Sequence, residues 1–234
     1  MKPSVVAIIP VRGSDPEVQS GDMMTLGGKP LLAYAIDAAA GSQFITRTLV
    51  STDDANVMQL AVRLGAEAPF LRPAELSAPQ VSLAEVLRHA LLWLEEHEGY
   101  HVDLVVLLEI THPLRPPGLV DHVIQVLLTE KLDSVFAARE EHHEFWTVTD
   151  RGVLERFHPR DGTPRKDLAP LYREMGGMAT AIRADLIRQG RRFGERVGLV
   201  PVHDVSSLID LHDEHGLRLA QAILKQRDVE RSPS

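Results

Sequence analysis

The 234-residue chain has no cysteine, only 5% aromatic residues and no apolar run approaching the roughly 20 residues of a membrane span. The lack of cysteine excludes disulfides and thiolate chemistry and is compatible with a reducing compartment. Positive charge is also scarce, since 25 Lys and Arg stand against 33 Asp and Glu, whereas a nucleic-acid groove needs a basic face. A strand is expected within the first few residues, which leaves no room for a signal peptide. We therefore predict a cytoplasmic protein that binds neither nucleic acid nor membrane.

Short apolar runs alternate with helical segments along most of the chain. This alternation predicts an α/β fold with a doubly wound, mainly parallel sheet, built as one domain over residues 1–234. Between residues 139 and 173 the alternation stops, and a charged, histidine-rich stretch predicts an excursion from the sheet. The expected strands are 5–9, 48–51, 68–71, 104–108, 134–138, 178–182 and 197–202, and the expected helices are 31–40, 55–64, 82–96, 118–128, 183–189 and 212–225.

The loop after the first strand is the first candidate site. It carries Arg12 and Gly13 and, further on, Gly28 and Lys29, so it can present backbone N–H groups and cations at the carboxyl end of that strand. Open α/β sheets bind their ligands at this edge. A guanidinium there can contact several phosphate oxygens at once. The pattern favours a polyanion ligand, the alternative being a solvated loop arginine.

Seven motifs, in order and at matching separations, resemble the CMP-sialic acid synthetases, or acylneuraminate cytidylyltransferases. They lie at residues 5–13 with 26–34, 50–54, 65–67 with 70–76, 107–115, 142–146, 171–177 and 209–212. The resemblance implies a nucleotidyltransferase fold and an enzyme that transfers CMP from CTP to a 2-keto-3-deoxy sugar acid, sialic acid-like or a related nonulosonate, with release of pyrophosphate. It also implies a divalent metal ion, Mg²⁺ or Mn²⁺, and a homodimer whose contacts come from residues 139–173.

The same resemblance assigns roles to individual residues. Arg12 and Asp210 are the expected catalytic residues, and Asp210 with His212 would hold the metal. The expected nucleotide contacts are Arg12, Gly13, Asp22, Arg72 and Ser82, and the expected sugar-acid contacts are Glu109, Arg165 and Arg173.

The chain departs from the family in the first loop. Two family lysines fall on Pro16 and Gly21, and the family asparagine falls on Asp22, while Asp15 and Glu17 are added acids. Carboxylates close to a phosphate repel it unless a cation lies between them. Either the loop uses a metal ion, with Asp15 or Asp22 helping Asp210 to hold it, or the loop has lost its role.

Further departures lie in the metal and acceptor motifs. His212 stands where the family has a second metal carboxylate, and because histidine favours softer ions, the change predicts better activity with Mn²⁺ than with Mg²⁺. Glu109 replaces a glutamine and cannot donate a hydrogen bond unless protonated, which suggests an unusual sugar. His142 and His143 are adjacent and would point to opposite faces of a strand, so a shared metal ion is not expected. Two alternatives stay open: a regulatory paralogue without turnover, and a transferase with another nucleotide or acceptor.

Overall fold

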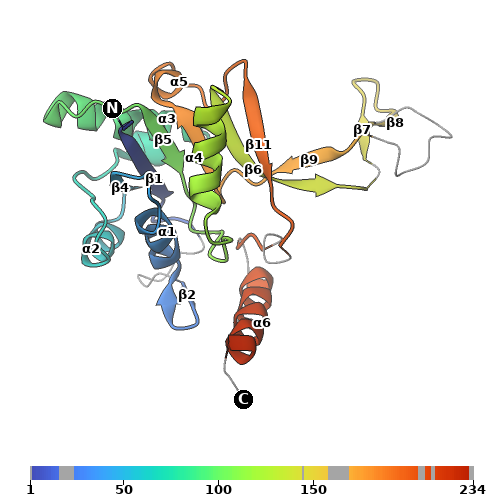
Figure 1. Ribbon diagram of the computed structural model, residues 1–234, viewed down its shortest axis with the longest axis horizontal. Helices are drawn as coiled ribbons and strands as arrows, with labels where there is room; N and C mark the ends of the chain where they lie inside the picture. The colour runs from blue at the N-terminus through green and yellow to red at the C-terminus, as the bar shows by residue number, and fades with distance from the viewer. Residues whose placement is uncertain are drawn as a thin grey trace.

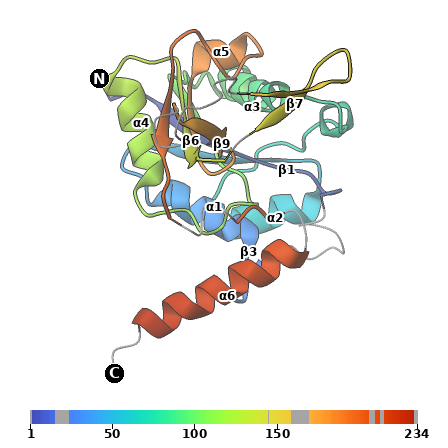
Figure 2. The ribbon, with the colours of Figure 1, turned by 90° about the vertical axis from the view of Figure 1, so that its right-hand side faces the viewer.

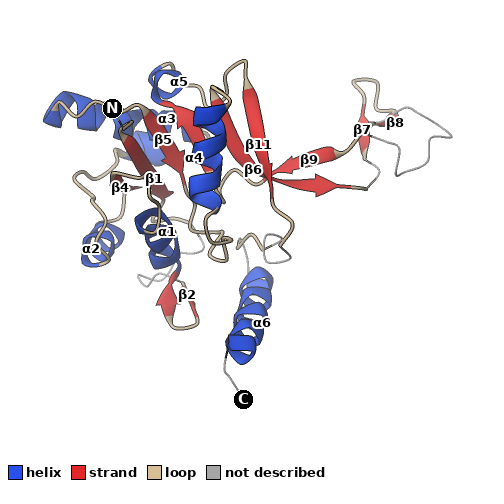
Figure 3. Ribbon diagram, viewed as in Figure 1, coloured by secondary structure: helices blue, strands red, loops and turns tan. Residues whose placement is uncertain are grey.

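The computed structural model describes residues 2–15, 24–143, 145–157, 169–204, 209–211 and 214–231, the last segment with side chains over 215–226. A central sheet has the strand order β11-β6-β10-β5-β1-β4, with helices on both faces (Figures 1 and 3). The strands are β1 (Val5–Val11), β4 (Arg47–Thr52), β5 (Leu104–Leu107), β6 (Ser134–Glu141), β10 (Thr180–Arg183) and β11 (Val197–Pro201). Strand β1 runs parallel to β4 and β5, and β6 runs parallel to β11. The predicted doubly wound, mainly parallel fold is confirmed.

Strand β10 is the exception, because it is antiparallel to both of its neighbours, β5 and β6. Its direction follows from the strand before it. After leaving the sheet along β6, the chain returns along the same strand, first as β9 (Leu171–Glu174) and then, past a turn, as β10. A strand that returns beside the strand it left must run the opposite way.

Strand β1 shows how the two helical layers are held. Its alternate residues Val5, Ala7, Ile9 and Val11 pack in one apolar cluster with α1 (Leu31–Ala40), α2 (Ala55–Arg63) and α4 (Leu119–Thr129). The residues between them, Val6 and Ile8, face a second cluster with α3 (Leu83–Glu98) and α5 (Ala184–Arg188). A strand buried on both faces is a continuous apolar run, as the sequence indicates here. Figure 2 shows α1 and α2 on one side of β1, with α3 and α5 on the other.

Two details of the predicted elements are wrong. Strand β1 continues to Val11, past the expected end at residue 9. Residues 68–71 do not form a strand, because that stretch meets β4 only through isolated bridges from Glu67 and Leu71, and Pro69 between them has no N–H to donate. The N-cap of α2 is Asp54. The Asp54 carboxylate accepts hydrogen bonds from the backbone N–H groups of Asn56 and Val57, as an N-cap does.

The predicted excursion projects from the sheet as an arm, which we define as the described residues 139–143, 145–157 and 169–174. Strand β6 continues past the sheet to Glu141 and pairs with β9, while β7 (Trp146–Val148) and β8 (Leu154–Arg156) form a hairpin beyond them (Figure 1). The remaining elements are a short hairpin of β2 (Thr25–Leu26) and β3 (Lys29–Pro30), the 3₁₀ turn η1 (Ala74–Ser77) and the last helix α6 (Glu214–Arg231). Helix α6 lies beyond α1 and α2, where it contacts β2 (Figure 2). Among the described helices, none has the length and apolar character that crossing a bilayer requires.

Candidate functional site

Directly after β1, residues 12–15 form a turn closed by hydrogen bonds. Arg12 donates from Nε to Asp15 Oδ1 at 3.0 Å and from its backbone N–H to Asp15 Oδ2 at 3.1 Å. The backbone N–H of Asp15 donates back to the Arg12 carbonyl at 3.1 Å. Asp15, one of the acids added to this loop, is therefore the partner of the arginine expected to bind phosphate. The Arg12 side chain stays 39% exposed, so a ligand can still reach it.

Gly13 is tied to the neighbouring strand end. Its backbone N–H donates to Asp53 Oδ1 at 2.8 Å, and Asp53 directly follows β4. The two loops lie so close that a Cβ on Gly13 would come within 2.9 Å of the Asp54 Cβ. A glycine is needed here for this approach. The carboxyl ends of β1 and β4 are thus joined through Gly13 and Asp53.

Arg72 lies beneath this junction with its side chain fully buried. Its guanidinium donates to the carbonyls of Val11 at 3.2 Å and Ser51 at 3.3 Å, and its Nε donates to Ser77 Oγ at 3.0 Å. Burial lowers the pKa of Arg72, the nearby Asp53 carboxylate raises it, and the Arg12 charge lowers it. Arg72 therefore links the ends of β1 and β4 through hydrogen bonds to their carbonyls. Its contact with the nucleotide stays a prediction.

Ser82, the other expected nucleotide contact, is the N-cap of α3. Its hydroxyl accepts from the backbone N–H of Glu85 at 3.3 Å, and Glu85 Oε2 accepts from the Ser82 backbone at 2.9 Å. This reciprocal arrangement is a capping box. The Ser82 hydroxyl and backbone hydrogen bonds lower the pKa of Glu85. A helix cap accounts for Ser82 in this structure, and its role toward a nucleotide stays a prediction.

Glu109 lies at the carboxyl end of β5, beside β1. Its backbone N–H donates to the Gly177 carbonyl at 2.8 Å, and its half-buried side chain lies over Gly177. A Cβ on residue 177 would overlap the Glu109 carboxylate, so the glycine makes room for the acid. The expected acceptor contact is thus built from two turns, one after β5 and one before β10.

Arg115 holds these two turns together. Its Nε donates to the Met178 carbonyl at 2.6 Å, and one terminal nitrogen donates to the carbonyls of Gly177, at 2.9 Å, and of Glu109. Burial of the guanidinium lowers the pKa of Arg115 to about 9, against the opposing influence of the Glu109 charge. The position of Glu109 therefore depends on a cation that lies underneath it.

Asp210 reaches the same edge from the segment 209–211. The backbone N–H of Leu211 donates to the Thr111 carbonyl at 2.9 Å, which places the segment beside the turn after β5. Ile209 and Leu211 are buried on either side of it, while the Asp210 side chain is 41% exposed and lies 3.8 Å from His112 Nδ1, measured at Oδ1. Asp22, Arg165 and His212, the other expected site residues, lie outside the described residues.

A divalent ion fits Asp210 as a single protein ligand. Over the part of the chain that the structure describes, no three His, Asp or Glu side chains gather as a closed metal site, and Asp15 is engaged by Arg12. Magnesium is commonly bound through one or two carboxylates together with substrate phosphates and water. We call the edge of the sheet at the carboxyl ends of β1 and β5 the strand-end edge. The exposed Asp210 carboxylate at this edge meets that requirement.

Arg173, expected near the sugar acid, lies on the arm instead of at this edge. It sits on β9 and pairs through Nε with Glu141 Oε1 at 3.2 Å. It lines a groove of about 560 Å³ on the arm with aromatic walls from Phe145, Trp146, Phe157 and Tyr172. Strand β9 runs out from the sheet (Figure 1). The described part of one chain therefore does not bring Arg173 together with Asp210.

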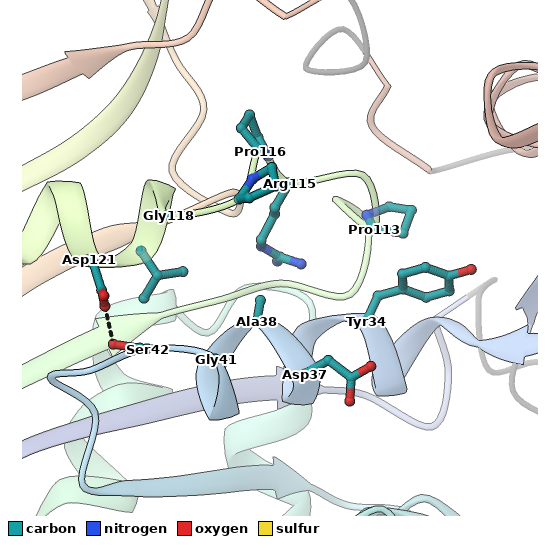
Figure 4. A pocket seen from close by; sticks show the side chains of 12 residues that line it. Tyr34, Asp37, Ala38, Gly41, Ser42, Pro113, Arg115, Pro116, Gly118 and Asp121 are labelled. Atoms are coloured by element: carbon teal, nitrogen blue, oxygen red, sulfur yellow. Dashed lines mark hydrogen bonds between the residues drawn. The ribbon is translucent and has the colours of Figure 1, made fainter. Parts of the chain in front are cut away.

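A second hollow, of about 320 Å³, lies between α1 and the turn that leads into α4. Figure 4 shows Arg115 extending toward it from above α1, and Ser42 Oγ hydrogen-bonded to Asp121 at its rim. Tyr34 and Asp37 line its α1 side. None of the residues expected to bind the nucleotide, sugar or metal lines this hollow. The candidate site is therefore the strand-end edge around Arg12, Glu109 and Asp210.

Sequence reasoning did not assign a role in the site to three residues at this edge: Asp53, His112 and Arg115. Each lies inside a motif that the family resemblance singles out, at 50–54 or 107–115. Their partners are backbone groups or side chains from distant segments. The motifs are therefore visible in the sequence, whereas the contacts are not.

Comparison with known proteins identifies the family of the chain. A family model described as cytidylyltransferase matches residues 6–162. The CMP-N,N'-diacetyllegionaminic acid synthase of Legionella pneumophila is 30% identical over 212 residues, which cover 88% of this chain and 90% of that protein. The N-acylneuraminate cytidylyltransferase of Escherichia coli O18:K1:H7 is 26% identical over 97% of this chain. The chain spans only about half the length of that protein, at 54%.

Solved structures share the fold. A CMP:2-keto-3-deoxy-manno-octonic acid synthetase complexed with CTP matches with a TM-score of 0.69 at 16% identity, covering 96% of this chain and 99% of that one. The 4-diphosphocytidyl-2C-methyl-D-erythritol synthase of Anaerococcus prevotii matches with the same TM-score at 14% identity, covering 96% and 100%. At these identities the likeness extends to the fold alone.

Proposed function

This chain belongs to the cytidylyltransferase family, and on that premise we propose that it transfers CMP from CTP to a 2-keto-3-deoxy sugar acid of the nonulosonate type and releases pyrophosphate. The observation that carries the proposal is the meeting of Arg12, Glu109 and Asp210 segments at one edge of the sheet, at the carboxyl ends of β1 and β5. Ligands of open α/β sheets bind at this edge. Similar proteins are named for legionaminic acid and for N-acylneuraminate.

The reaction is an in-line attack by an acceptor hydroxyl on the α-phosphorus, with pyrophosphate as the leaving group. Positioning and charge neutralisation supply most of the catalysis in such transfers. Arg12, at the end of β1, neutralises phosphate charge. Glu109, held over Gly177 by Arg115, accepts a hydrogen bond from the sugar and orients it. Asp210 presents its carboxylate at the same edge of the sheet.

A divalent ion belongs to this proposal, with Asp210 as its protein ligand. When bound, the ion would screen the triphosphate charge from the carboxylates of this edge. We expect Mn²⁺ to support activity better than Mg²⁺, because His212 replaces a hard carboxylate ligand in the motif. The roles of His212 and Asp22 rest on the motif alone.

A homodimer formed through the arm is also part of the proposal. The arm exposes large apolar side chains that a solitary chain would leave in water, including Trp146 at 56% and Phe157 at 58% exposed. Contiguous exposed apolar surface of this kind marks protein–protein contacts. Arg173 lines the same groove, and with Arg165 it would then reach the acceptor site of a second copy. Light scattering should report a dimer at micromolar concentration, and replacing Trp146 with a charged residue should yield a monomer.

One observation favours a second candidate function, a regulatory paralogue that binds nucleotide without turnover. Asp15 already neutralises Arg12, and the loop lacks the lysines of the family. Pyrophosphate release separates the two functions, measured across CTP and other nucleotides, Mg²⁺ and Mn²⁺, and a panel of sugar acids. We expect release with CTP. No release in any combination, together with a thermal shift on adding CTP, would favour the regulatory function instead.

A further inference from the structure

His112 and Asp210 come from distant parts of the chain and meet at the strand-end edge. We propose that His112 is a positioning residue that sets the orientation of the Asp210 carboxylate toward the metal–nucleotide complex. This inference rests on the proposed function, in which Asp210 is the metal ligand. The histidine that lies beside Asp210 in this structure is His112, from the turn after β5. The sequence motif alone indicates a different histidine, His212.

The backbone fixes the relation between the two residues. Leu211, which follows Asp210, donates its N–H to the carbonyl of Thr111, which precedes His112, at 2.9 Å. Ile209 and Leu211 are both buried, so the segment cannot rotate without exposing apolar surface. Asp210 lies between two anchored residues and presents its carboxylate on the other side. Its remaining freedom is the rotation of its own side chain.

The imidazole of His112 is placed to restrict that rotation. Its side chain is only 5% exposed, and its Nδ1 lies 3.8 Å from Asp210 Oδ1. Thr111 Oγ1 lies 3.0 Å from the same Nδ1, which fixes the plane of the ring. A separation of 3.8 Å is too long for a hydrogen bond, but such contacts commonly shorten when the ligand binds. Partners of this kind orient metal-binding side chains, and losing one typically costs about 10–100-fold in metal affinity.

The test measures metal-dependent binding of CTP to the full chain by titration calorimetry, with Mn²⁺ and without metal. The variants are His112→Leu, Asp210→Asn and the double variant, with His112→Asn as the conservative change. Asparagine keeps a polar atom near the position of Nδ1. His101→Leu is the matched control, because His101 also faces an aspartate, Asp103 at 3.5 Å, but at the opposite end of β5.

We expect His112→Leu to weaken Mn²⁺-dependent CTP binding about tenfold, His112→Asn to retain most of the affinity, and His101→Leu to change nothing. If His112 acts through Asp210, the double variant binds no more weakly than Asp210→Asn alone, since coupled residues are not additive. A purely structural role would not give this result. Thermal unfolding verifies that each variant is folded. If His112→Leu does not fold, His112→Gln replaces it, because the longer amide moves the polar atom away from the Nδ1 position.

Two results would overturn the inference. Unchanged affinity in His112→Leu is one, and a double variant that shows the product of both single losses is the other. Either result leaves the proposed function standing, because the wild-type protein still binds CTP with Mn²⁺. If the wild-type protein binds no CTP with either metal and releases no pyrophosphate, the proposed function and this inference fall together.

Discussion

The two halves of the strand-end edge handle charge in opposite ways. In the β1–β4 half, the cations are matched by carboxylates of the same chain: Arg12 pairs with Asp15, and Arg72 lies 3.8 Å from Asp53. In the β5–β10 half, the cation Arg115 is enclosed beneath backbone carbonyls, and acids face the site. The first half balances its own charge, whereas the second presents negative charge outward.

This difference has a consequence for ligand binding. A triphosphate that approaches the β1–β4 half must compete with Asp15 for Arg12, because the two family lysines are replaced and Lys29 pairs with Asp37. In the proposed function a divalent ion supplies the missing positive charge, and Asp210, the carboxylate that we assign to it, lies in the other half. We therefore expect that neither half binds the nucleotide well alone.

The largest expected effect comes from breaking the acidic half. Asp210→Ala removes the one ligand among the described residues that we assign to the metal, so pyrophosphate release from CTP should fall to background. The measurement is a coupled pyrophosphate assay at saturating Mg²⁺ and Mn²⁺. Asp204→Ala is a suitable control, since Asp204 is an exposed acid that precedes Asp210 in the chain, just past β11. Substantial turnover by the Asp210→Ala variant would show that the metal is held elsewhere.

The next effect concerns the support under Glu109. Arg115→Met removes the guanidinium that donates to the carbonyls of Met178, Gly177 and Glu109, although the Gly177 carbonyl keeps the backbone N–H of Glu109. A buried group left unsatisfied costs about 1–3 kcal/mol. We expect the free energy of unfolding in urea to fall by about 3 kcal/mol, together with weaker binding of the sugar acid. Arg183→Met serves for comparison, because the Arg183 Nε donates to a single carbonyl, that of Leu132. Equal losses in the two variants would remove the special role of Arg115.

A smaller effect is expected from opening the β1–β4 half. Asp15→Asn removes the charge that competes for Arg12, so the apparent KM for CTP should decrease, by about fivefold at most for a partly exposed pair. Asp185→Asn breaks a pair of the same spacing, Asp185 with Arg188, away from the site and should leave the KM unchanged. A higher KM in Asp15→Asn would mean that Asp15 helps to hold the metal, as the sequence suggests.

The smallest effect is a pH dependence behind Arg72. Burial lowers the pKa of His89 below its ordinary 6.5, and the Arg72 charge lowers it further. The unfolded chain binds the His89 proton more readily than the folded chain. The free energy of unfolding therefore keeps its full value above pH 6.5 and declines as the pH falls below that value. In urea denaturation at pH 5–7.5, His89→Gln should flatten this decline. His101→Gln, at an exposed histidine, should keep the wild-type slope. A wild-type slope in His89→Gln would assign the acid sensitivity to other groups.

Local patterns in the sequence predict most of the fold. The apolar run of β1 and the helical spacing in α1 and α3 predict elements that the structure confirms. The spacing of apolar residues along the chain indicates whether an element is buried on one face or on two. The direction of β10 is not predictable in this way, since it depends on the return of the chain along β6. Strand direction is a property of pairing between distant segments.

The candidate site was predictable as a set of residue types at one edge but not as a set of contacts. Arg12 and Arg72 both follow strand ends in the sequence, yet one is partly exposed and the other is fully buried. Which arginine faces a ligand depends on the loop that covers it. Likewise, the meeting of His112 with Asp210 requires the turn after β5 to pack against a segment close to the last helix.

The central claim, that the two halves of this edge together join a nucleotide to a sugar acid, is tested most directly by identifying the product. The protein is incubated with CTP, with Mn²⁺ or Mg²⁺, and with one sugar acid: sialic, legionaminic, pseudaminic or 2-keto-3-deoxy-manno-octonic acid. The products are then identified by mass spectrometry. We predict a CMP-sugar acid conjugate formed in equal amounts with pyrophosphate. The absence of any conjugate with every acid and both metals, from a folded dimer, would contradict the account.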